Sequence, residues 1–248
     1  MNRIFAAIAL TALVGLLFID RGHPVLAADG EFETPGDDSS TGLPEQYAKD
    51  YLVAASTISP DKKLAVIYPT LDAEDAAKGA NQRGHIKDQI VALHPFAVLG
   101  ELQTKFPYFQ NENHGGISSQ WSNDSSVALV NLDGKWGPHD VFLLEFNGGK
   151  LVRTTNILAK AHDLLLPDFS KSKAEPYNDV FDFVFDDEDG PVFKLDGSKN
   201  VLIDGDAVTD PKGISEHGWS AHLKAVWDIS QSKFTSHKIT PSNRKQSE

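Results

Sequence analysis

The chain has 248 residues, no cysteine and a formal net charge of −12 at pH 7. Without cysteine it has neither disulfide bonds nor thiolate metal ligands, so a hydrophobic core must hold the fold together. The acidic charge disfavours non-specific binding to nucleic acid or to anionic lipid, because both carry the same sign.

Residues 1–27 have the pattern of a secretory signal peptide. Arg3 gives a positive start, residues 4–19 carry no charge, and the small residues before Ala28 offer a cleavage site after Ala27. A membrane anchor is the alternative, but this apolar run is shorter than the roughly 20 residues that a span needs. We therefore predict a periplasmic or secreted protein with no membrane contact after cleavage.

The segment that follows is acidic and contains few bulky apolar residues. Such a sequence buries too little surface to offset its ordering entropy, which predicts a disordered acidic leader over residues 28–48. The remaining chain is divided into a folded domain over residues 49–240 and a flexible C-terminus over residues 241–248. Its length is sufficient for one core without covalent cross-links.

Within this domain the same hairpin pattern occurs three times. Each copy has an apolar residue, five turn-forming residues and an apolar run, over residues 58–68, 121–130 and 195–203. Two further alternating runs follow each copy, at 89–93 and 97–102, 140–146 and 151–157, and 223–227 and 234–239. The chain is therefore expected to be mainly β, with three four-stranded antiparallel meanders spanning about 51–104, 117–157 and 190–240. Asp61, Asp124 and Ser198 are then equivalent turn positions.

Short motifs in these hairpins resemble those of TolB-like and WD-type β-propeller repeats. They are the Ser-Pro-Asp-Lys turn at 59–62, the Trp-Ser-Asn-Asp variant at 121–124, and Trp227-Asp228 at the end of a third strand. The resemblance implies a propeller-like array of blades. Three units are too few to close a ring. Further hidden blades, an open or sandwich-like array, and a ring completed by a second chain are the alternatives.

Two segments interrupt the repeat. Apolar residues near helical spacing over 156–169 predict one short helix that ends at Pro167. The alternating stretch 177–185 predicts a further strand, which is either the first strand of the third unit or an added edge.

The loops between second and third strands collect histidine, carboxylate and tryptophan residues. A histidine stands at or before each third strand, and with two aspartates these form a candidate metal set for calcium or zinc: His85, His139, His222, Asp206 and Asp210. The candidate ligand-binding residues are Trp136, His139, Trp219 and His222. Structural hydrogen bonds from the histidines, and tryptophans folded back over the sheet, are the alternative interpretations.

A dense acidic run lies over residues 182–189 and continues in Asp204, Asp206 and Asp210. Clustered carboxylates with a nearby glycine are a possible calcium site, but the spacing does not match an EF-hand loop. A solvated acidic hairpin is the alternative interpretation.

No nucleophile elbow, phosphate-binding loop or dinucleotide fingerprint occurs in the chain. The first functional hypothesis is therefore a non-enzymatic binding or scaffolding module that holds a protein or a small polar ligand on its loop face. The second is a metal-assisted hydrolase built from His139, His222 and carboxylates such as Asp206 and Asp210. The third is a homo-oligomer that completes its β-ring with a second chain.

Overall fold

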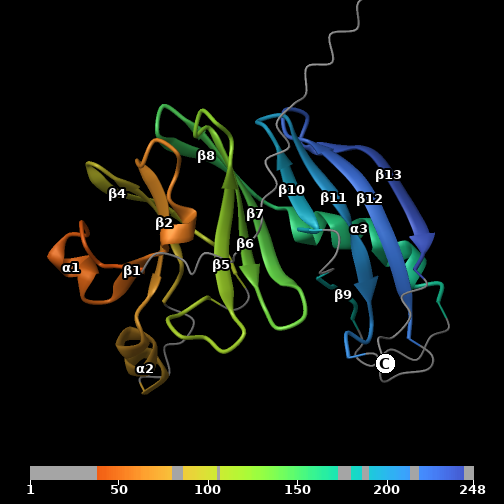
Figure 1. Cartoon of the computed structure of the whole chain (residues 1–248), viewed down its shortest axis with the longest axis horizontal. Helices are drawn as coiled ribbons and strands as arrows, with labels where there is room; N and C mark the ends of the chain where they lie inside the picture. Colours follow the sequence, from red (N-terminus) through yellow and green to blue (C-terminus); the bar gives the residue numbers. More distant parts are fainter. Residues whose placement is uncertain are drawn as a thin grey trace, which may run out of the picture. The chain divides into compact units, whose positions relative to one another are not determined.

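The computed structural model describes residues 38–79, 86–104, 107–172, 180–185, 190–212 and 218–242. Three antiparallel sheets succeed one another along the chain (Figure 1). Sheet A contains β1 (Tyr51–Val53), β2 (Leu64–Pro69), β3 (Gln89–Leu93) and β4 (Phe96–Glu101). Sheet B contains β5 (Gly116–Trp121), β6 (Val127–Asp133), β7 (Pro138–Asn147) and β8 (Lys150–Asn156). Sheet C contains β9 (Asp182–Phe183), β10 (Phe193–Asp196), β11 (Asn200–Val208), β12 (Ser220–Asp228) and β13 (Lys233–Pro241).

The prediction of a mainly β chain with three four-stranded meanders is confirmed. In each sheet the strands pair in chain order, and β9 is the one strand outside this path. The helices are α1 (Glu45–Ala48), α2 (Leu71–Gly79) and α3 (Ile157–Phe169), with a 3-10 turn, η1, at Ala55–Thr57. No helix in the described residues is both long and apolar enough to cross a membrane.

Both faces of sheet B are buried, one against sheet A and the other against α3 and sheet C, so sheet B lies between the other two sheets. Side chains alternate along a strand, so Ala128 and Val130 point to one face of β6 while Val127 and Leu129 point to the other. The first pair belongs to a core shared with sheet A, and the second to a core shared with α3 and sheet C. Figure 1 shows the three sheets in this order, and α3 packs into the core that sheets B and C share.

The first segments of successive units are also neighbours. The Ser56 hydroxyl, in η1, donates to the Ile117 carbonyl of β5 at 2.6 Å. In turn the Gln120 side chain of β5 donates to the Phe193 carbonyl at 2.8 Å and accepts from the Leu195 N–H at 2.9 Å, both in β10. Equivalent segments therefore follow one another from sheet to sheet. The likeness to propeller repeats remains a prediction.

Of the three turns predicted to be equivalent, those at Asp61 and Asp124 have the same hydrogen bonds and the same backbone conformation. The Asp61 carboxylate accepts from the Ser59 hydroxyl and the Lys63 N–H, and the Asp124 carboxylate accepts from the Ser122 hydroxyl and the Ser126 N–H. The residue after each aspartate has a positive φ, 59° at Lys62 and 57° at Ser125. The third turn is different, because its positive φ falls on Gly197, before Ser198.

The ordered domain begins earlier than predicted. Residues 38–48 were assigned to a disordered leader, yet they contain α1, and Leu43 is buried against the outer face of sheet A. Asp38 explains this order, because its carboxylate accepts from the Ala55 N–H at 2.8 Å and from the Tyr68 hydroxyl at 2.6 Å. The described chain ends beyond β13, whose last residue is Pro241.

Three further details differ from the sequence prediction. Helix α2 lies in the first long loop, where only a polar connection was expected. Helix α3 continues two residues past Pro167, because a proline in the last turn removes one donor without ending the helix there. Strand β9 is the added edge, since it pairs with the far half of β11 while β10 pairs with the near half.

Candidate functional site

The three histidines of the loop-face hypothesis lie in different surroundings. His85 falls outside the described residues. The His139 ring lies against the backbone of Gly134, where a Cβ would stand 2.1 Å from its Nε2 atom. Burial raises the pKa of the adjacent Asp133 carboxyl to about 6, and the charge of nearby His139 opposes this rise. His139 is therefore packed over its own hairpin, with a carboxyl group beside it.

His222 lies on the outer face of sheet C, the face that points away from sheet B. Its Nδ1 atom is 2.8 Å from Asp206 Oδ1, and its Nε2 atom is 2.8 Å from Asp204 Oδ1. Both ring nitrogens are therefore engaged by carboxylates. With its nitrogens occupied in this way, His222 cannot bind a metal without breaking one of these contacts.

The predicted metal set does not form one cluster in the described part of the chain. Only His222 and Asp206 are brought into contact, while Asp210 accepts from the Lys212 N–H at 3.0 Å in the connection after β11. No group of three or more His, Asp or Glu side chains in the described residues could hold a metal ion. Residues 186–189 of the acidic run lie outside the described residues.

The two candidate loop tryptophans have opposite environments. Trp136 is 41% exposed at the tip of the β6–β7 hairpin, and the Phe185 N–H donates to its carbonyl at 3.0 Å. Trp219 is only 8% exposed and packs against Phe169 and Phe181 in the core between sheets B and C. Its ring is part of the core and does not face a ligand at the surface.

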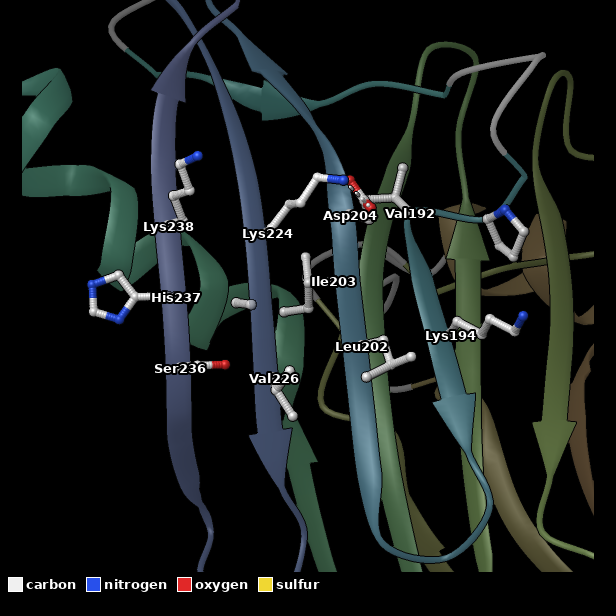
Figure 2. A pocket seen from close by; sticks show the side chains of 12 residues that line it. Val192, Lys194, Leu202, Ile203, Asp204, Lys224, Val226, Ser236, His237 and Lys238 are labelled. Atoms are coloured by element: carbon white, nitrogen blue, oxygen red, sulfur yellow. Dashed lines mark ion pairs between the residues drawn. The ribbon is translucent and has the colours of Figure 1, made fainter. Parts of the chain in front are cut away.

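A hollow with a volume of about 520 Å³ lies on the outer face of sheet C. All four main strands of the sheet contribute to it (Figure 2). Its apolar floor is made by Leu202 of β11 and Val226 of β12, with Val192 at one margin. Lys194 stands on β10, Lys224 on β12 and Lys238 on β13, as Figure 2 shows.

Strand register arranges these side chains in two rows across the sheet. Lys238 is opposite Lys224, which is opposite Asp204. In the adjacent row the neighbours are Ser236, Val226, Leu202 and Lys194. Residues two apart on a strand share a face, so both rows belong to the same outer surface. The hollow therefore combines a row of charges with a row that is apolar at its centre and ends at a lysine.

The charges of the hollow are not balanced. Among the described residues, Asp204 is the one carboxylate that lines it, and this group already contacts two cationic or donor groups. Its Oδ2 atom is 2.9 Å from Lys224 Nζ, while its Oδ1 atom is 2.8 Å from the His222 ring. Lys194 and Lys238 form no ion pair with any residue that the structure describes. Two exposed ammonium groups thus remain uncompensated in a chain whose net charge is −12.

A buried carboxyl group lies at the junction of sheets A and B. Asp88 is 0% exposed; its Oδ2 atom accepts from the Tyr108 N–H at 2.9 Å, and its Oδ1 atom has no hydrogen-bond partner among the described residues. Burial raises the pKa of Asp88 to about 8, and the charges of Glu112 and Asp140 act in the same direction. Asp88 is therefore largely protonated at neutral pH.

No family model, curated protein or solved structure matches this chain. The hollow on sheet C and the buried Asp88 were both missed by sequence reasoning. The alternation in β11, β12 and β13 would have shown which residues face outward, but only the strand register shows which of them are neighbours. Asp88 gave no signal, because its burial depends on the connection that carries Tyr108.

Proposed function

We propose that this protein is a non-enzymatic binding module that holds a polypeptide partner against the outer face of sheet C. The observation that carries the proposal is the hollow of about 520 Å³, with an apolar floor and lysines around it. A concave surface that combines apolar area with a few placed polar groups is typical of ligand-binding sites. This proposal moves the binding surface from the loop face to a sheet face.

The chemistry of the described residues favours binding over catalysis. The best-defined polar constellation is Asp206–His222–Asp204, and neither a serine nor a threonine hydroxyl contacts the His222 ring. With both ring nitrogens in contact with carboxylates, His222 presents no free nitrogen that could take a proton from a nucleophile. The His222 ring instead holds the Asp204 carboxylate beside Lys224, and both Asp204 and Lys224 line the hollow.

A single fluorescent label tests this proposal, because the chain contains no cysteine. Ser236→Cys places an environment-sensitive dye in the hollow, and Thr154→Cys on β8 of sheet B places it on an exposed strand elsewhere. Both proteins are titrated with three mixtures of heptapeptides that are acidic, neutral or basic. We expect a saturable change at position 236 with at least one mixture and none at position 154. No change at position 236 with any mixture, or equal changes at both positions, would overturn the proposal.

We further propose export, with cleavage between Ala27 and Ala28. The uncharged run 4–19 after Arg3 and the small residues at the cut support this. N-terminal sequencing of the chain recovered from its native source checks it. A mature chain that starts at Ala28 is expected, and a retained Met1 would contradict cleavage.

A further inference from the structure

We propose that the outer face of sheet C recognises an acidic polypeptide segment in which two carboxylates flank one aliphatic residue. This inference rests on the proposed binding function and adds the identity of the partner. The occupant is a segment of another polypeptide, bound in extended form across the strands.

Lys224 and Lys238 stand directly opposite one another on β12 and β13. Like charges at directly opposite positions destabilise a sheet, and an anion between them removes that cost. Lys224 is already paired with Asp204, at 2.9 Å, whereas Lys238 forms no ion pair with any residue that the structure describes. One carboxylate of the partner is therefore expected at Lys238.

Lys194 supplies the second anion position. It stands on β10, at the opposite margin of the hollow from Lys238, and forms no ion pair with any described residue. Three strand spacings separate β10 from β13. At about 4.8 Å each, with a stagger of two residues along the strands, the Cα atoms of the two lysines are roughly 16 Å apart across the sheet. An extended chain covers that distance in about four to five residues.

The floor between the lysines selects the central residue. Leu202 and Val226 are neighbours in register and both are half-buried, so an aliphatic side chain placed over them loses further apolar surface to water. In an extended peptide, residues i, i+2 and i+4 point to the same side. The matching pattern is an acidic residue, any residue, an aliphatic residue, any residue, and a second acidic residue.

The same features disfavour a uniformly charged polymer. A nucleic acid or a sulfated polysaccharide would be repelled by the net charge of −12 and would place charged or polar groups over Leu202 and Val226. A short peptide with two carboxylates gains both lysine contacts and covers the apolar floor. Charge complementarity is therefore local, within a protein that is acidic as a whole.

Fluorescence anisotropy with defined peptides tests the inference. The probe is dye-labelled Gly-Glu-Ser-Val-Ser-Glu-Gly, and the neutral control has glutamine in place of both glutamates. We expect the acidic probe to bind the purified chain at least tenfold more tightly than the neutral one. Lys194→Glu with Lys238→Glu should weaken the acidic probe at least tenfold. The matched reversal of two exposed lysines outside the hollow, Lys150→Glu with Lys171→Glu, should leave its affinity within twofold.

The possible failures can be told apart. Equal binding of both probes, with a dye response at position 236, would overturn the acidic partner and leave the binding function standing. Binding of heparin but of neither peptide would show that the occupant is a polyanion. Sedimentation of the chain as a dimer that is abolished by the Lys194→Glu and Lys238→Glu changes would show that a second copy occupies the face. Absence of any peptide binding and of any dye response would overturn both proposals.

Discussion

The outer faces of sheets A and C mark the two ends of the described stack, and they are built in opposite ways. On sheet A, Ala65, Ile67 and Val91 are buried beneath the segment that contains Leu43 and α1. On sheet C the corresponding second and third strands carry Asp204 and Lys224 around the half-buried Leu202 and Val226. The same meander thus serves once as a packing surface and once as an open surface.

This difference shows that position in a stack does not determine what a sheet face does. Sheet B is apolar on both faces because it has a neighbour on each side. In repeat proteins the terminal units require a polar outer face for solubility. Sheet C meets this requirement with ion pairs, whereas sheet A meets it with a covering segment. The second solution leaves a smaller hollow, of about 150 Å³, beside the covering segment of sheet A, against about 520 Å³ on sheet C.

The largest expected loss of stability is at the inner face of sheet C, and a substitution on the loop surface is its comparison. Trp219→Ala should lower the free energy of unfolding by about 3–5 kcal/mol, because it removes a large ring from the core beside Phe169 and Phe181. Trp136→Ala should lower it by less, about 1–2 kcal/mol, since 41% of that residue is exposed. Urea unfolding followed by circular dichroism checks both values. Similar losses in the two variants would contradict this assignment.

The next comparison sets one outer face against the other. Ile67 on β2 is 0% exposed, so Ile67→Ala should destabilise the chain by about 2–5 kcal/mol. Leu202→Ala, on β11 of sheet C, should cost less, about 1–2 kcal/mol, because its half-buried side chain borders an open hollow. The same urea unfolding experiment applies. If Leu202→Ala were as damaging as Ile67→Ala, the outer face of sheet C would have to be covered.

A smaller effect concerns two carboxyl groups in contrasting settings. The folded-state pKa of Asp88, about 8, lies above its ordinary value of 3.8. Between these two pH values Asp88 is protonated in the folded chain and ionised in the unfolded chain. The contribution of Asp88 to the free energy of unfolding is therefore complete below about pH 4 and is lost as the pH rises to 8.

Asp88→Asn should remove this dependence and raise stability at pH 8 by about 1–3 kcal/mol, because a displacement of one pKa unit corresponds to about 1.4 kcal/mol. Asp204→Asn is the control, since that carboxylate is exposed and paired with Lys224 and His222. Thermal melts from pH 5 to pH 8 measure the difference between variant and parent chains. A constant difference across this range, with Asp88→Asn less stable throughout, would mean that Asp88 is ionised in the folded chain.

Local sequence patterns predicted the strands well, because alternation and turn chemistry act over a few residues. The turn at Asp61 and the turn at Asp124 have the same hydrogen bonds that their similar sequences suggested. The order of residues 38–48 was not predictable in this way. It depends on Asp38 contacting Tyr68, thirty positions away.

The candidate site was harder to predict than the fold. Loop histidines and tryptophans attract attention in a sequence, yet Trp219 is buried, and the His222 ring is bound by carboxylates from a neighbouring strand. The hollow is formed by ordinary lysine, leucine and valine residues whose importance lies in their register. Register requires the paired strands, so composition and motif spacing could not reveal this surface.

The most direct test of the open face is a charge exchange at its two uncompensated lysines. The chain carrying Lys194→Glu and Lys238→Glu is titrated with the glutamate peptide and with its counterpart that has lysine in both places. We expect the parent chain to prefer the glutamate peptide and the variant to prefer the lysine peptide, each by at least tenfold. An unchanged preference in the variant would show that Lys194 and Lys238 do not face the partner.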